Sequence, residues 1–169
     1  MTSSKKILVS TLACVTFSLA QGALAQTTAY PPLANNVPMG APLTLEQARK
    51  VVALAEAESK KRQWPMAIEV VQPNGTPVLT EYMDGTQYAS IAVAHKKALA
   101  SALFRRPTKV QSDALKGGRM EVLALPGAMP VAGGYPLMEN GKMVGALGVS
   151  GGSDDQDELI ASLAAQLMK

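Results

Sequence analysis

His95 is the only histidine of the chain, which limits the acid–base and metal chemistry that its side chains can perform. A serine triad needs a histidine base beside a placed serine and a carboxylate. The stretch GVSGG at 148–152 is only weakly similar to the turn that carries such a serine, and the acidic residues after it disfavour an oxyanion. No two histidines and no group of cysteines has the spacing of a protein zinc site. The sequence therefore favours a binding protein over a hydrolytic enzyme, and no residue is assigned as catalytic.

A cluster of basic residues surrounds the end of the helix-like segment that contains His95. Its members are Lys96, Lys97, Arg105, Arg106 and Lys109. Arginine binds carboxylates with two parallel hydrogen bonds, so the cluster suits a ligand that carries carboxylates. The alternative is a solvated helix end, where the charges simply suit the helix dipole. We take Arg106 and Thr108, in the turn that follows the helix, as candidate ligand contacts.

A glycine-rich turn, VSGGSDDQDE at 149–158, follows an apolar stretch and precedes a helix-like segment, which is the order found at many nucleotide sites. Four carboxylates fill the first turn of that helix. They belong to Asp154, Asp155, Asp157 and Glu158. These charges stabilise the helix N-terminus but repel a phosphate, and no Lys-Ser/Thr pair follows the glycines. The turn therefore predicts a helix capped by Ser153 or Asp154 instead of a nucleotide site.

Helix and strand signals predict an α+β domain in which helices flank one antiparallel sheet. Strands are expected at 67–71, 78–83, 135–139 and 142–150, with Pro73-Asn74-Gly75 and Asn140-Gly141 as hairpin turns. Helices are expected after the capping box Thr44–Gln47, over 87–104, after Thr108 as N-cap, and from Asp154 to Met168. The second helix is rich in alanine on every side, so other elements can approach it closely.

The first 25 residues have the features of a secretory signal peptide. Lys5 and Lys6 precede an apolar stretch at 7–19, and Ala23-Leu24-Ala25 forms a cleavage site of small residues. A retained membrane anchor is the alternative. Residues 26–42 carry four prolines and no charge, which predicts a flexible tether before a domain at 43–169. The mature chain is thus expected to be periplasmic or secreted.

The charge of the expected mature chain is nearly balanced. Loss of Lys5 and Lys6 leaves 14 Lys and Arg residues against 13 Asp and Glu residues. This balance, with no polybasic face, argues against a nucleic-acid partner. No stretch after the signal peptide is long and apolar enough to span a membrane. We expect a small-molecule ligand as partner, together with self-association into a homo-oligomer through the alanine-rich helix.

Five short motifs, in the same order along the chain, carry a resemblance to a known family. They are LTLEQA at 43–48, MDG at 83–85, KALASALFRRPT at 97–108, LPGAMPV at 125–131 and VGALGVSGGSDDQDE at 144–158. No single motif is specific, but together they make the chain similar to the secreted haem-binding HbpS-like and GlcG-like family over 43–169. The resemblance implies a profilin-like domain with a five-stranded antiparallel sheet, oligomeric assembly, and haem or a related tetrapyrrole as ligand.

The resemblance also gives roles to candidate site residues. It implies haem as cofactor, with His95 as a candidate axial ligand of the iron, and Lys97 matches a lysine of the family. Tyr82, or else Tyr88 or Tyr135, is the alternative donor, because tyrosine oxygen suits ferric haem. Three positions depart from the family: Gln72, Tyr82 and Ala100, where relatives often have aspartate, arginine and threonine. Any contact that relatives make through these three side chains is therefore in doubt for this chain.

Together these observations predict a secreted, oligomeric protein that binds haem or another small anionic ligand through the second helix and the turn after it. One alternative is an enzyme or accessory protein acting on a small organic acid of the glycolate type, whose carboxylate Lys97 or Arg106 would hold. The other is a structural or sensory partner protein without ligand chemistry of its own.

Overall fold

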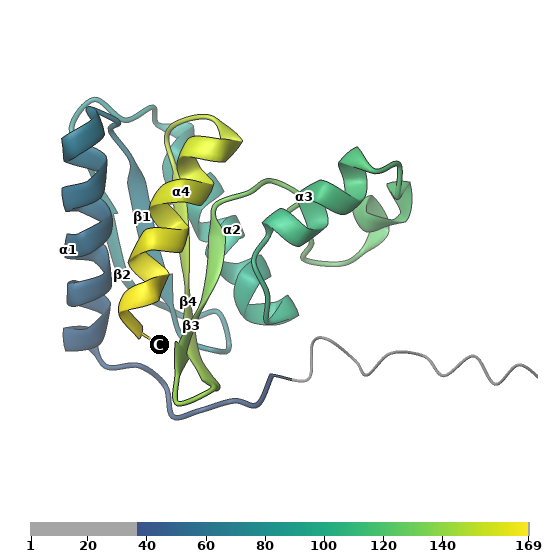
Figure 1. Cartoon of the computed structure of the whole chain (residues 1–169), viewed down its shortest axis with the longest axis horizontal. Helices are drawn as coiled ribbons and strands as arrows, with labels where there is room; N and C mark the ends of the chain where they lie inside the picture. Colours follow the sequence, from purple (N-terminus) through teal and green to yellow (C-terminus); the bar gives the residue numbers. More distant parts are fainter. Residues whose placement is uncertain (1–36, 169) are drawn as a thin grey trace, which may run out of the picture. The chain divides into compact units, whose positions relative to one another are not determined.

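The computed structural model describes residues 37–168, so the expected signal peptide and residues 26–36 of the expected tether lie outside the described residues. The helices are α1 (Leu45–Arg62), α2 (Ala89–Phe104), α3 (Lys109–Lys116) and α4 (Asp154–Ala165), with 3₁₀ turns η1 (Met120–Ala124) and η2 (Gln166–Met168). The strands are β1 (Ala67–Val71), β2 (Pro77–Tyr82), β3 (Gly134–Glu139) and β4 (Lys142–Ser150). One antiparallel sheet is thus flanked by helices, and the expected α+β class is confirmed (Figure 1).

The sheet has the strand order β2-β1-β4-β3, and all three strand pairs are antiparallel. Within residues 37–168 it contains four strands, so the five strands implied by the family resemblance are wrong for this chain. The segment before α1 lies beside the start of β4 but forms only an isolated bridge, between Met39 and Met143. Pro38 and Pro42 flank this bridge, and a proline has no N–H to donate to a sheet. A further strand therefore does not extend from the bridge.

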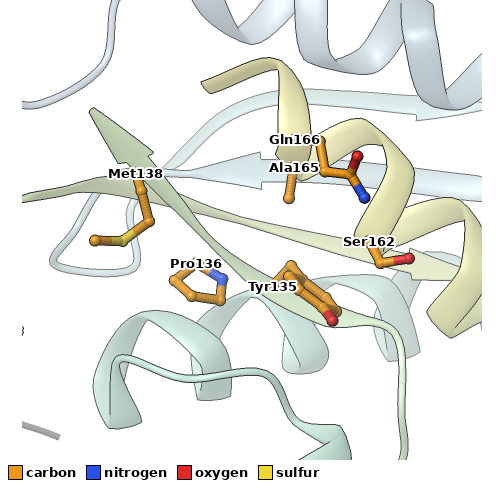
Figure 2. A pocket seen from close by; sticks show the side chains of 6 residues that line it. All are labelled: Tyr135, Pro136, Met138, Ser162, Ala165 and Gln166. Carbon is orange, nitrogen blue, oxygen red and sulfur yellow. The ribbon is translucent and has the colours of Figure 1, made fainter. Parts of the chain in front are cut away.

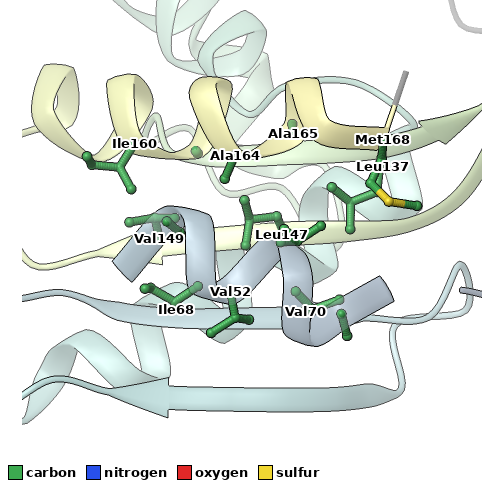
Figure 3. Packing of buried hydrophobic residues seen from close by; sticks show 14 of the residues in the cluster. Val52, Ile68, Val70, Leu137, Leu147, Val149, Ile160, Ala164, Ala165 and Met168 are labelled. Atoms are coloured by element: carbon green, nitrogen blue, oxygen red, sulfur yellow. The ribbon is translucent and has the colours of Figure 1, made fainter. Parts of the chain in front are cut away.

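The larger core lies between one face of the sheet and helices α1 and α4 (Figure 3). Side chains of the two central strands take part in it, among them Ile68 and Val70 of β1 and Leu147 and Val149 of β4. Val52 of α1 and Ile160 of α4 pack onto them, and all six side chains are almost fully excluded from water. Burial of each such side chain stabilises the fold by about 1.5–3 kcal/mol, so this layer holds the sheet against α1 and α4.

Helix α2 covers the opposite face of the sheet at unusually short range. Val71 and Ala146 of the sheet meet Ala98 and Ala102 of the helix in a second, small apolar cluster. A Cβ atom added at Gly148 would lie 2.0 Å from the carbonyl oxygen of Ala94. Helix and strand backbones are therefore nearly in contact, which confirms the close approach predicted from the alanine-rich sequence.

The ends of the elements follow local sequence signals at most positions. Thr44 with Gln47 and Ser153 with Gln156 form complete capping boxes at the starts of α1 and α4. Asn140 and Gly141 both have positive φ, as a tight hairpin turn requires. Thr108 precedes α3 as predicted, but its side chain does not cap the helix. In the part of the chain that the structure describes, no helix is long and apolar enough to cross a membrane.

Candidate functional site

His95 is held by a buried carboxylate on the α2 face of the sheet. Its Nδ1 lies 2.6 Å from Oε1 of Glu69, whose side chain is only 4% exposed. The other carboxylate oxygen accepts a hydrogen bond of 3.2 Å from the hydroxyl of Thr80 on the neighbouring strand. The imidazole itself is 39% exposed, and within residues 37–168 its Nε2 has no hydrogen-bond partner. Two strands thus orient one ring nitrogen inward and leave the other accessible.

A shallow, mostly apolar hollow of about 290 Å³ lies on the same helix, near His95 although His95 is not among its lining residues. It is lined by Lys96, Leu99, Gly127, Ala128 and Met129. Leu99 follows His95 by four residues, which places both side chains on one face of α2. Lys96 is exposed and brings a positive charge to the rim. The hollow therefore combines an apolar wall with a cation, and the oriented imidazole of His95 lies one helical turn from its wall residue Leu99.

Lys97 lies inside the protein, where it joins α2 to the glycine turn before α4. Its Nζ donates to Oδ2 of Asp157 at 2.6 Å and to the carbonyl of Val149 at 3.1 Å. The other carboxylate oxygen of Asp157 accepts the N–H groups of Gly151 and Gly152 at 3.1 and 2.9 Å. Burial raises the pKa of Asp157, while Lys97 and these N–H groups oppose the shift. The donors of the glycine turn are thus used by a carboxylate of the chain itself.

Thr108 and Arg106, the candidates in the turn after α2, have different surroundings. Thr108 is buried and exchanges two hydrogen bonds with Gly134: its N–H donates to the Gly134 carbonyl, and its hydroxyl accepts the Gly134 N–H, both at 2.9 Å. This is why Thr108 does not cap α3. The Arg106 guanidinium lies 5.7 Å from the centre of the Phe104 ring. Arg106 also lines a second, smaller hollow, distinct from the one beside His95.

Of the tyrosines proposed as alternative donors, Tyr82 and Tyr135 line different hollows, and Tyr88 is 92% exposed. Tyr82 donates its hydroxyl to the carbonyl of Thr86 and lines a hollow whose wall carries three carboxylates, of Glu56, Glu81 and Asp84, against one cation, Lys60. Such a wall disfavours a ligand that carries carboxylates. Within residues 37–168 no group of three or more His, Cys, Asp or Glu side chains is placed to hold a metal ion.

Tyr135 lines a hollow of about 190 Å³ between β3 and the end of α4 (Figure 2). No charged side chain is among the six residues that line it. It is smaller than the roughly 300–1,000 Å³ of sites that bury drug-sized ligands. Burial, and secondarily the nearby charge of Glu158, raises the pKa of Tyr135 to about 12. This hollow is therefore not suited to an anionic tetrapyrrole.

The raised pKa of Tyr135 predicts a loss of stability in alkali. The folded state keeps the phenol proton up to about pH 12, whereas the unfolded chain loses it near the ordinary tyrosine pKa of 10.0. The unfolded state then binds fewer protons, so stability falls as pH rises from about 10 to 12. Absorbance at 295 nm should show one fewer phenol ionising near pH 12 in Tyr135→Phe. In Glu158→Gln the Tyr135 pKa should fall but stay above 10. If Tyr135→Phe and the wild type show the same number of phenols ionising near pH 12, the prediction is contradicted.

The structure separates the five residues that the sequence put forward. His95 pairs with Glu69 one helical turn from Leu99, which lines one hollow; Arg106 lines another and Tyr82 a third, and Lys97 and Thr108 are bonded internally. Sequence reasoning missed Glu69, the partner of His95. Its signal was a lone carboxylate within the apolar strand AIEVV at 67–71. A buried charge needs a partner, so this position was a site candidate by itself.

Known proteins are similar to this chain in sequence and in structure. GlcG of Escherichia coli K12 is 29% identical over 108 residues, which cover 64% of this chain and 81% of GlcG. A solved structure of a double mutant of Streptomyces reticuli HbpS superposes with a TM-score of 0.70 at 29% identity, covering 83% of this chain and 99% of that one. The structure of a PduOC:heme complex superposes with a TM-score of 0.67 at 28% identity, over 74% and 94% of the two chains.

The family model described as "Haem degrading protein HbpS-like" matches residues 43–166. This span contains all four helices and all four strands of the sheet. It also contains the Glu69–His95 pair and the hollow next to it. The chain therefore belongs to the HbpS-like family.

Proposed function

We propose that this protein is a secreted or periplasmic binding protein for haem or a related tetrapyrrole, with His95 as the iron ligand. The observation that carries the proposal is the 2.6 Å pair between His95 Nδ1 and Glu69 beside an apolar hollow. The similarity to HbpS and to PduOC, which was solved as a haem complex, supports the choice of ligand.

The pair has the arrangement that metal-bound histidines use. Such histidines donate their second ring N–H to a carboxylate, which fixes the tautomer and raises the basicity of the nitrogen on the metal. Here Glu69 accepts from Nδ1 and leaves Nε2 as the iron-binding atom. Thr80 in turn fixes Glu69. A haem held here would supply an iron that binds nitrogen donors, and the protein would supply Nε2 of His95 in a set orientation.

The residues that line the hollow would make the remaining contacts with the haem. Leu99 and Met129 offer an apolar surface for part of the ring, and Lys96 offers a partner for a propionate. At about 290 Å³ the hollow is just below the size of sites that enclose drug-sized ligands, so a haem keeps one face outside it. Tyr88, directly before α2, and Ile91, in its first turn, are exposed at 92% and 42%. We propose that a second copy of the chain packs on this exposed part of α2 and covers the ring.

Haem titration of the purified mature protein tests the iron ligand. Wild type should develop a Soret band, and His95→Ala should shift its maximum and weaken binding because the axial nitrogen is lost. Glu69→Gln keeps the imidazole but removes the charge behind it, and should lower affinity by about 10–100-fold. Tyr82→Phe is the control and should leave the spectrum unchanged. A Soret band of unchanged position and affinity in His95→Ala would refute His95 as the ligand.

The location is a separate part of the proposal and rests on the first 25 residues of the sequence. Protein recovered from the periplasm or medium of an expressing bacterium should begin at or near Gln26, as N-terminal sequencing will show. A chain that still begins at Met1 would contradict secretion by cleavage, and it would leave the haem site untouched.

A further inference from the structure

We propose that the hollow beside Arg106 is a second binding site, which takes a short-chain monocarboxylate. It lies between the turn after α2, helix α3 and the 3₁₀ turn η1, and has a volume of about 110 Å³. It shares no lining residue with the hollow next to His95. The inference is therefore independent of the haem proposal.

Arg106 provides the first reason, because its guanidinium is incompletely satisfied. Its Nε is buried and has no hydrogen-bond partner within residues 37–168. No carboxylate in this part of the chain lies within salt-bridge distance of it, and its guanidinium instead stacks on Phe104. A buried donor without an acceptor is costly, and more so when it belongs to a charged group. The arrangement calls for an acceptor that the described chain does not supply.

The second reason is the set of polar groups on the wall of the hollow. The groups that are not already bonded within the protein are hydrogen-bond donors. Arg119 is the second guanidinium, and its Nε pairs with Glu121 at 2.9 Å, which leaves its terminal N–H groups. Gln111 uses its Oε1 to accept the N–H of Met129 at 2.8 Å, which leaves its amide N–H₂. No Asp or Glu lines the hollow. Two guanidinium groups, of which only that of Arg119 is paired with a carboxylate, and an amide donor around one space favour an anion.

Size and lining narrow the class of anion. One water molecule takes about 30 Å³ of liquid, so the space holds roughly three or four groups of that size. The remaining wall is apolar. It is formed by Val110, Ala114, Val122 and Leu125. A carboxylate with one to three further carbons places its oxygens on the arginines and its alkyl chain on this wall. A phosphate or a dicarboxylate would press a charged oxygen against apolar side chains.

Calorimetric titration of the haem-free mature protein with sodium propionate tests the proposal. We expect saturable binding, and in Arg106→Gln an affinity lower by about tenfold or more, because a charge-assisted hydrogen bond is lost. Arg62→Gln is a matched control: Arg62 also stacks on an aromatic ring, 5.8 Å from the centre of Trp64, but it pairs with Glu58. Its substitution should leave propionate binding unchanged.

Two further measurements distinguish a site for a monocarboxylate from a patch of positive charge that attracts any anion. Ala114→Leu should block binding while leaving both arginines in place, because the added side chain fills the hollow; circular dichroism verifies that the variant folds. Phosphate and succinate should compete at least tenfold less well than propionate. Absence of saturable propionate binding, or equal binding by phosphate, would overturn the proposal. Haem titration of Arg106→Gln should match wild type, so that a failure of either proposal is seen apart from the other.

Discussion

Replacing Lys97 with methionine is expected to lower the free energy of unfolding by about 3–5 kcal/mol, because it leaves a buried carboxylate without its cation. The side chains of Lys97 and Asp157 are only 1% and 4% exposed, and their charged atoms lie 2.6 Å apart. Urea denaturation followed by circular dichroism measures the loss. The slope of the transition should stay constant, since the surface exposed on unfolding is unchanged.

Two further variants show whether the charge is the cause. Lys97→Met combined with Asp157→Asn should recover most of the lost stability, because asparagine keeps an oxygen for the N–H groups of Gly151 and Gly152 without the buried charge. Lys60→Met removes the cation of an exposed ion pair with Glu56, and should change the urea midpoint little. A midpoint in Lys97→Met as close to wild type as that of Lys60→Met would show that the buried pair is not needed.

Gly148→Ala should be similarly damaging, at about 3 kcal/mol or more, near the upper end for an overpacked core. The new Cβ would lie 2.0 Å from the carbonyl oxygen of Ala94 and 2.6 Å from the backbone nitrogen of Ala98. Both are backbone atoms of α2, so no side chain can rotate away. The central strand β4 cannot shift either, because it pairs with β1 and β3 on its two edges. Helix and sheet must separate, which weakens the whole second layer.

Gly117→Ala is the matched control for this substitution. Gly117 ends α3 with a φ of −79°, and an added Cβ would come no closer than 3.3 Å to its neighbours. Its conformation is open to alanine, so stability should change little. Thermal melting of both variants gives the comparison. Equal melting temperatures for Gly148→Ala and Gly117→Ala would mean that α2 has room to move off the sheet.

The features that the sequence predicted well depend on contacts within a few residues. The capping boxes at Thr44 and Ser153 and the turn at Asn140-Gly141 are each decided by side chains and dihedral angles of one short stretch. The four strands were located for the same reason, since alternating or apolar runs between turn signals indicate strands directly. The fifth strand was expected only from the family, and nothing in this chain's own pattern marked it.

The features that the sequence did not predict depend on what lies opposite in space. Lys97 was grouped with the basic residues at the helix end as a candidate ligand contact, because its partner Asp157 is 60 residues away. Thr108 has the residue type of a helix cap, but its hydroxyl oxygen accepts the N–H of Gly134 instead. Glu69 was not selected, because its partner His95 sits on a different element, 26 residues further on. Each of these pairings is set by tertiary packing.

The strand order has a consequence for how the chain reaches its fold. The centre of the sheet is the pairing of β1 with β4, where Ala67 meets Ser150 and Val71 meets Ala146. The chain is synthesised from its N-terminus, so β1 is made long before β4. One edge of β1 therefore stays unpaired until β4 has been synthesised. Closing contacts over such sequence distances slows folding, and the waiting strand edge is open to pairing with other chains. The sheet can therefore close only after the last hairpin has been synthesised, and the core is completed later still, when α4 adds Ile160 to it.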